Sequence, residues 1–343
     1  MELFKKIKIN VGRSKEREIR FSGIPIFQYG KKETNGECEK YFEILPKSFE
    51  HKFLDKIIKQ LDDNYDYVIL MRASGLGEIY SLGIFIREMI SNAGAKKTCI
   101  VSHYNPPLVN ACKLIMPDIP IIVTDELSRS DFNSYIKESK IMYKGITFQC
   151  FHCILDDAIS LIDDRNIHNE SYLTRIGKYI GCQNLNQTVP LLFDNEAKDA
   201  VNLLSGINLN KFVIFLPEAN FFAPLSKDFW TNLAAEFRKK GYDIYVNKTE
   251  GLSDNLTVSQ LVYLSSFCKG IVALRCGLLE FMSRFNIPKH ILYTSEKATG
   301  HSEGFIPLFT LKKYPDVIPE TVFEYEAEKY SDKILVQEII KDF

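Results

Sequence analysis

The chain has 343 residues, of which 45% are hydrophobic and 25% charged, and this composition is typical of a water-soluble globular protein long enough for two domains. Its 43 Lys and Arg residues nearly balance 44 Asp and Glu residues, for a formal net charge of −1, so no overall attraction draws it to nucleic acid or to an anionic membrane. Because the charged N-terminus does not resemble a signal peptide and no apolar run reaches membrane-spanning length, we expect a cytoplasmic protein that binds no nucleic acid.

Residues 1–60 are predicted to form a basic N-terminal extension with a small β-hairpin. Seven Lys and Arg residues stand against three Glu residues in the first twenty positions. The segment 20–29 resembles a small β-hairpin or a pair of edge strands, because Pro25 excludes a central strand. Two interpretations remain open for the basic arm: it packs back on the first domain, or it contacts anionic headgroups at the inner membrane from the cytoplasmic side.

Residues 61–190 are predicted to form the first domain. Short apolar runs alternate there with helical patterns, which is typical of βαβ units around a parallel sheet. Strands are expected at 67–71, 98–101, 120–123 and 146–150, and helices at 79–91, 107–116, 131–143, near Ala158 and at 172–179. A polar linker near 181–195 ends this half.

Residues 191–330 show the same alternation of short apolar runs and helical patterns and are predicted to form the second domain. Strands are expected at 212–216, 242–246, 271–274 and 290–293, and helices at 196–204, after the capping residue Ser226, from Thr257 and after Gly277. Residues 331–343 read as an amphipathic C-terminal helix.

A glycine loop follows the first strand of the first domain, with the sequence Ser74-Gly75-Leu76-Gly77-Glu78. Its glycines allow a ligand to approach the backbone closely, and Glu78 is a candidate general base. The alternative is that Glu78 only compensates the helix dipole. No third glycine follows at dinucleotide-binding spacing, which disfavours a Rossmann cofactor site. His103, which follows the next strand, is a further candidate residue for the same site.

A second turn at a strand end, Arg275-Cys276-Gly277-Leu278, leads into the helix that carries Glu280. Free amides and an arginine at this position indicate an anion site, and Glu280 could accept hydrogen bonds from ribose. The alternative is that Gly277 only makes a tight strand-to-helix connection.

Three further residues are candidates for donor binding. Lys227 begins a helix and could clamp a diphosphate, although a surface lysine would be equally ordinary there. Glu218 and Glu250 follow strands of the second domain and could accept hydrogen bonds from a base or a ribose.

Metal ligands are sparse in the sequence. The eight cysteines are scattered, which favours a reducing compartment over a disulfide framework. Cys150-Phe151-His152-Cys153 resembles the start of a zinc knuckle, but no second Cys/His pair follows at zinc spacing. No Asp-x-Asp pair is present to hold a metal–diphosphate complex. We therefore expect no metal and no other cofactor.

Four segments resemble a known family, the ADP-heptose:lipopolysaccharide heptosyltransferase superfamily of GT-B glycosyltransferases. They are the 74–78 loop, Phe215-Leu216-Pro217-Glu218-Ala219, Lys227 with Trp230, and 260–293. The chain departs from the family pattern in three places. Glu78 replaces the usual Asp, Arg275-Cys276 replaces an acidic-small pair, and Leu279-Glu280 stands where Met-His is common.

The resemblance implies an α/β protein of the GT-B class, with two Rossmann-like domains facing a central cleft. It implies an enzyme that moves a sugar from a nucleotide-sugar donor on the second domain to a hydroxyl of a glycan or glycolipid acceptor, such as lipopolysaccharide or capsule, on the first. Glu78 would be the base, and Arg275, Lys227 and the amides after Gly277 would stabilise the leaving diphosphate. The alternatives are a polysaccharide pyruvyl transferase or sugar-nucleotide epimerase on the same fold, or a non-catalytic protein that binds a glycan or nucleotide.

Overall fold

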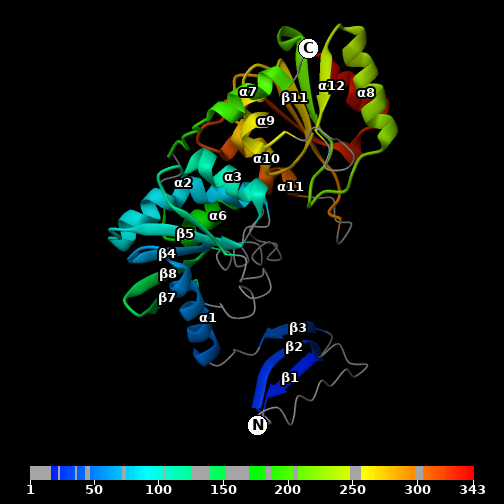
Figure 1. Ribbon diagram of the computed structural model, residues 1–343. Helices are drawn as coiled ribbons and strands as arrows, with labels where there is room; N and C mark the ends of the chain where they lie inside the picture. The colour runs from blue at the N-terminus through cyan, green and yellow to red at the C-terminus, as the bar shows by residue number, and fades with distance from the viewer. Residues whose placement is uncertain are drawn as a thin grey trace.

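The protein is an α/β structure with two five-stranded sheets and a separate three-stranded sheet near the N-terminus (Figure 1). The computed structural model describes residues 17–21, 24–34, 37–42, 47–71, 75–103, 105–124, 139–151, 170–182, 187–203, 208–247, 256–297 and 304–343, and of residues 17–49 it describes the backbone alone.

The N-terminal sheet is antiparallel, in the order β1-β2-β3. Its strands are β1 (Arg17–Phe21), β2 (Ile24–Thr34) and β3 (Glu37–Phe42). Pro25 pairs with Arg20 next to a register irregularity, where a residue without an N–H is tolerated. The basic residues before Arg17 lie outside the described part of the chain.

The first large sheet has the order β6-β5-β4-β8-β7. Its strands are β4 (Tyr67–Met71), β5 (Thr98–His103), β6 (Ile121–Thr124), β7 (Lys140–Tyr143) and β8 (Ile146–Cys150). Its helices are α1 (Lys47–Gln60), α2 (Leu76–Ala93), α3 (Pro106–Ile115) and α6 (Tyr172–Tyr179).

Strand β4 is buried on both faces because helices cover each side of it. Tyr67, Ile69 and Met71 belong to one hydrophobic cluster with α2 and α3, whereas Val68 and Leu70 belong to a second cluster with α1. This division follows from the alternation of side chains along a strand. Helix α1 lies within the segment 1–60 that the sequence assigns to the extension, and the structure joins it to the core of the first sheet.

The helix expected over 131–143 is wrong at its end, because Lys140–Tyr143 is strand β7, antiparallel to β8. Lys144 and Gly145 connect the two strands with φ of 51° and 80°, the left-handed conformation that two-residue hairpin turns require. Residues 131–138 and the expected helix near Ala158 lie outside the described residues.

The second large sheet is fully parallel, in the order β10-β9-β11-β12-β13. Its strands are β9 (Phe212–Leu216), β10 (Asp243–Val246), β11 (Gly270–Leu274), β12 (Lys289–Tyr293) and β13 (Val322–Glu326). Its helices are α7 (Asn195–Leu203), α8 (Lys227–Lys239), α9 (Val258–Ser265), α10 (Leu278–Met282), α11 (Phe305–Phe309) and α12 (Asp332–Ile340). Every residue of β9, β11 and β12 is buried, as expected where helices cover both faces.

The expected helix starts of this half are confirmed. The Ser226 hydroxyl accepts from the Phe229 amide at 3.0 Å, and Thr257 and Gln260 form a reciprocal capping box. Helices α7, α9 and α10 lie on the side of the sheet that faces the first half, and α8 and α12 pack together on the other side (Figure 1).

The two halves are joined by side chains of α2 and α3. Asn110 accepts from the Ser259 amide at 2.9 Å. Asp316 accepts from the Tyr80 hydroxyl at 3.2 Å and pairs with Arg284 at 2.6 Å. These contacts fix the walls of the space between the two sheets relative to one another.

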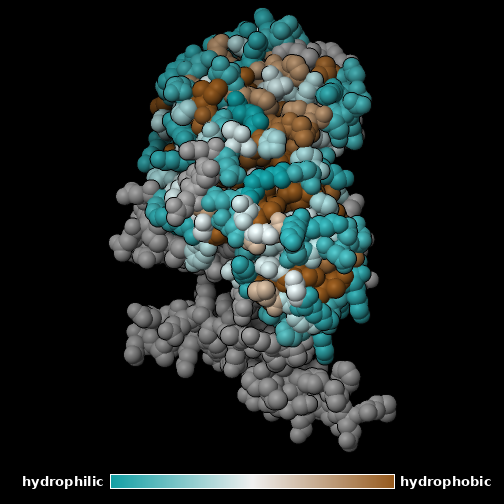
Figure 2. All heavy atoms as spheres, turned by 90° about the vertical axis from the view of Figure 1, so that its left-hand side faces the viewer, coloured by the Kyte–Doolittle hydropathy of each residue, from teal (hydrophilic) through white to brown (hydrophobic). Residues whose placement is uncertain are grey.

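In the coloured part of the face shown in Figure 2, hydrophilic residues surround separate groups of hydrophobic residues. Across the described part of the chain, none of the helices combines the length and apolar character that a membrane span needs.

Candidate functional site

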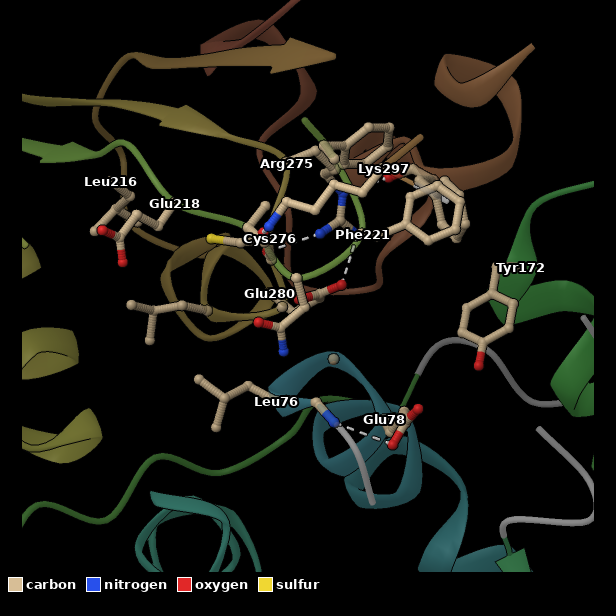
Figure 3. A pocket seen from close by; sticks show the side chains of 18 of the residues that line it. Leu76, Glu78, Tyr172, Leu216, Glu218, Phe221, Arg275, Cys276, Glu280 and Lys297 are labelled. Carbon is tan, nitrogen blue, oxygen red and sulfur yellow. Dashed lines mark hydrogen bonds and ion pairs between the residues drawn. The ribbon is translucent and has the colours of Figure 1, made fainter. Parts of the chain in front are cut away.

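A pocket of about 720 Å³ lies between the two large sheets. Its walls come from segments that follow the carboxyl ends of strands in both sheets, where open α/β sheets bind ligands. The first half contributes Gly75, Leu76, Gly77, Glu78 and Tyr172, and the second contributes Leu216, Glu218, Ala219, Asn220, Phe221, Phe222, Pro224, Asn247, Arg275, Cys276, Gly277, Leu278, Glu280, Lys297 and Phe309. Figure 3 shows Glu78 and Leu76 below the pocket, with Arg275 and Lys297 above it.

The pocket brings together most of the residues that the sequence singles out. Those that line it are Gly75, Gly77, Glu78, Glu218, Arg275, Cys276, Gly277, Leu278 and Glu280. Lys227 and His103 are not among the lining residues, and Ser74 and Glu250 lie outside the described part of the chain.

Glu78 stands in the first turn of α2, at the edge of the pocket. One of its carboxylate oxygens, Oε2, accepts from the Gly75 amide at 3.2 Å. A carboxylate in the first turn of an 18-residue helix is also favoured by the helix dipole. Glu78 thus combines two features: it caps the helix start and it faces the pocket with a carboxylate.

Arg275 is buried, with 6% of its surface exposed, and its donors are directed at the protein. Nε donates to the Phe309 carbonyl and Nη1 to the Cys276 carbonyl, each at 2.8 Å, and Nη2 pairs with Glu280 at 2.5 Å. Burial disfavours its charge, but the Glu280 carboxylate, together with Tyr293 and Tyr314, outweighs burial and raises the pKa of Arg275 above its usual value. Arg275 therefore shapes this wall of the pocket as part of a buried ion pair.

Glu280 is the counter-ion of Arg275 and is itself 2% exposed. Its Oε1 accepts from Arg275 and also from the Tyr314 hydroxyl at 3.2 Å. Its Oε2 has no hydrogen-bond partner among the described residues and lies beside Gly77 at the start of α2. Oε1 thus links Arg275 and Tyr314 within the second half, and the same carboxylate packs against Gly77 of the first half.

The turn after β11 needs glycine for a reason of packing. Gly277 has φ −65° and ψ −14°, a conformation open to any residue. A Cβ at this position would stand 2.2 Å from the Gly77 nitrogen. In the same turn, burial raises the pKa of Cys276 to about 11 although Arg275 opposes the shift, so the thiol stays neutral and is no nucleophile at neutral pH.

Two lining features were not predicted as site residues. Lys297 donates from Nζ to the Ala219 carbonyl at 2.5 Å, and Phe221, Phe309 and Tyr172 form an aromatic wall with ring centroids 5.6 and 5.9 Å apart. The position of Lys297, four residues after the end of β12, is a usable sequence signal for a strand-end ligand group. Tyr172 comes from a different half of the chain, so no local pattern indicates it.

Two predicted residues do not line the pocket. Lys227 is exposed at the first position of α8. His103 ends β5, in register with Thr124 of β6. No group of three or more potential metal ligands occurs within the described residues; Cys150 is buried in β8, and His152 and Cys153 fall outside them.

No protein-family model matches the chain, and no curated protein matches it in sequence. A comparison with solved structures finds similar chains. ADP-heptose lipopolysaccharide heptosyltransferase II of E. coli shares 13% identity with a TM-score of 0.47, over 81% of this chain and 99% of that chain. The E. coli heptosyltransferase WaaC with ADP shares 11% identity with a TM-score of 0.45, over 81% and 100%. A family 9 glycosyl transferase from Veillonella parvula shares 10% identity with a TM-score of 0.48, over 82% and 99%.

Proposed function

We propose that the chain is a glycosyltransferase that moves a sugar from a nucleotide-sugar donor to a hydroxyl of a cell-surface glycan, such as lipopolysaccharide or capsule. The observation that carries the proposal is the composition of the pocket. Glu78 stands on the wall of the first half, and Lys297 with the Arg275–Leu278 turn stands on the wall of the second. A carboxylate facing cationic and aromatic groups across a pocket suits the attack of a hydroxyl on a sugar diphosphate.

The acceptor would bind along the first half, residues 61–190. Gly75 and Gly77 carry no side chains, so an acceptor can come close to the start of α2. A Cβ on Gly75 would meet no atom within 4 Å, which leaves open space beside Glu78. From this position Glu78 would take the proton of the attacking hydroxyl.

The donor would bind along the second half, residues 191–330. Glu218 is exposed in the pocket after β9, and Asn247 lines it after β10. Both can accept hydrogen bonds from ribose hydroxyls. Phe221, of which 38% is exposed, offers a ring face to a nucleobase. Catalysis without a metal is part of the proposal, with cationic side chains balancing the diphosphate.

One observation favours a second candidate. Because Glu78 already accepts from the Gly75 amide, it can serve as a helix cap alone, and the pocket would then bind a nucleotide or glycan without turnover. The cytoplasmic location and the inner-membrane contact of the basic arm remain proposals from the sequence.

The test has two steps. In the first, unfolding temperature is measured with ADP, UDP, GDP, CDP and their sugar conjugates, with and without EDTA. A ligand of the native state at a hundredfold excess over its dissociation constant adds about 2.7 kcal/mol of stability, so we expect a clear rise with one base that EDTA leaves unchanged. In the second, release of the nucleoside diphosphate from its sugar conjugate is measured with acceptor glycans. Binding without release would favour the second candidate. No binding of any nucleotide would overturn the first candidate and would leave, of the second, glycan binding alone.

A further inference from the structure

A diphosphate in the pocket needs a cation, and the described lining residues include two cationic side chains, Arg275 and Lys297. Arg275 is committed to the protein, since each of its three nitrogens donates to a protein oxygen and Glu280 balances its charge. A buried pair of this kind has little positive charge left for a ligand. Among the described lining residues, the positive charge available to a ligand is therefore that of Lys297.

The backbone around Lys297 is held by pairing between the loop after β9 and the segment after β12. The Lys297 amide donates to the Phe221 carbonyl at 3.0 Å, and the Ala223 amide donates to the Ser295 carbonyl at 2.8 Å. Phe222 and Glu296 form an antiparallel bridge between these two contacts. The Thr294 hydroxyl adds a bond to the Ala223 carbonyl at 2.6 Å. Lys297 is thus fixed to the loop that supplies Phe221 of the aromatic wall.

The side chain of Lys297 keeps donors for a ligand. An ammonium has three N–H donors, and within the described part of the chain one of them bonds to an acceptor, the Ala219 carbonyl at 2.5 Å. No carboxylate among the described residues forms an ion pair with it. A carbonyl orients the ammonium without neutralising it, and Lys297 lines the pocket on the same wall as Arg275 (Figure 3).

We propose that Lys297, and not Lys227, binds the diphosphate of the donor. This inference rests on the proposed function and identifies the cation of the same site. Lys227 begins α8 as an exposed residue and does not line the pocket. Replacing Lys297 should therefore weaken diphosphate binding, whereas replacing Lys227 should not.

The experiment compares the full-length protein with Lys297→Gln and Lys227→Gln by calorimetric titration. The probes are inorganic pyrophosphate, the nucleoside diphosphate that binds the wild type most tightly, and the matching nucleoside. Gln removes the charge but keeps an N–H donor for the Ala219 carbonyl, so the conformation of the loop after β9 should be retained. We expect Lys297→Gln to weaken the diphosphate and pyrophosphate about 10- to 100-fold, as for a charge-assisted hydrogen bond, and to leave the nucleoside unchanged. Lys297→Arg should restore part of the loss, and Lys227→Gln should match the wild type.

The outcomes separate the two proposals. If no nucleotide and no pyrophosphate binds the wild type, the proposed function fails. If the diphosphate binds and Lys297→Gln retains full affinity, the function stands and the role of Lys297 is wrong. Loss of affinity in Lys227→Gln in place of Lys297→Gln would return the role to Lys227. An equal loss for nucleoside and diphosphate in Lys297→Gln would mean that the variant disturbs the loop and that Lys297 does not act on the phosphates.

Discussion

Gly277 and Gly77 meet backbone to backbone where the two halves of the chain touch, so closely that a Cβ on Gly277 would stand 2.2 Å from the Gly77 nitrogen. The turn after β11 therefore packs directly on the start of α2. Both segments line the pocket, and their contact sets how far apart the two walls stand.

We expect Gly277→Ala to destabilise the protein, because the main chain fixes the position of the new methyl group and the atoms that it would meet are backbone atoms of Leu76 and Gly77, which cannot rotate away. Overpacking of this kind costs about 1–3 kcal/mol, measurable as a lower midpoint of denaturant unfolding. Nucleotide affinity should fall as well, since the Arg275–Leu278 turn must shift.

Gly75→Ala is the matched control for Gly277→Ala. A Cβ at Gly75 meets nothing within 4 Å, and its φ of −149° is open to alanine. The unfolding midpoint of Gly75→Ala should stay close to that of the wild type. If Gly277→Ala is equally stable, the contact between the two glycines is not the constraint that we describe.

Arg275 and Glu280 give a second prediction, on stability. Arg275→Met would leave the Glu280 carboxylate buried with Tyr314 as its one remaining hydrogen-bond donor among the described residues. Removing one partner of a buried pair costs about 3–5 kcal/mol, whereas replacing both by apolar residues is often much milder. Denaturant unfolding of Arg275→Met, Glu280→Met and the double variant tests this: the double variant should be more stable than either single variant.

The control is the exposed pair Lys239–Glu236 on α8, with 70% and 41% of the side chains exposed. Solvent screens such pairs, so Lys239→Met should change the unfolding midpoint little. Single losses at Arg275 and Glu280 that are as small as this one would contradict a buried ion pair.

Much of the fold could be predicted because its signals are local. The buried strands β9 and β11 are short apolar runs, and Ser226 and Thr257 mark helix starts by their own side chains. Strand β7 was missed because Lys140–Tyr143 carries no alternation that separates it from a helix, and the deciding signal is the two-residue turn that follows.

The site was harder to predict, because its decisive contacts join distant residues. The sequence indicates Arg275 as an anion ligand, yet its partners Phe309 and Glu280 lie 34 and 5 residues away and use its donors. From the sequence, Gly277 is interpreted as a turn glycine. A side chain is excluded there because the backbone of Gly77, 200 positions earlier, lies too close. Such relationships depend on how the two halves dock, and periodicity within a segment carries no information on that.

The environment of His290 leads to a prediction of how the free energy of unfolding depends on pH. It is fully buried, stacked on Phe323 with ring centroids 4.8 Å apart, and its Nδ1 lies 3.0 Å from the Tyr325 hydroxyl. Burial, with a smaller contribution from Lys341, lowers the pKa of His290 to about 3, from 6.5 in the unfolded chain. Asp342, 3.7 Å from Nε2, opposes this shift, but it is partly exposed and burial prevails.

The sign of the effect follows from proton binding. Between pH 6.5 and 3 the unfolded chain binds a proton at His290 and the folded chain does not, so stability falls as pH decreases, by about 1.4 kcal/mol per unit. Unfolding free energies at pH 7.0, 6.0 and 5.5 test this above the range where carboxylates dominate. His290→Gln should lower stability at pH 7 and flatten the slope. An unchanged slope in this variant would show that His290 is not the responsible group.

Glu78 gives the prediction that bears on catalysis. Glu78→Gln keeps an oxygen that can accept from the Gly75 amide, so the start of α2 and the unfolding temperature should not change. It removes the proton acceptor, and the loss of a general base lowers turnover about 10²- to 10⁴-fold. Donor affinity should stay near wild type, because the proposed donor contacts lie on the other wall.

Glu218→Gln is the matched control on that wall, and it should weaken donor binding with little effect on turnover at saturation. If Glu78→Gln turns over at the wild-type rate, Glu78 is a helix cap and the base must be sought elsewhere. If donor affinity and turnover fall together, its carboxylate binds the donor and does not act as the base.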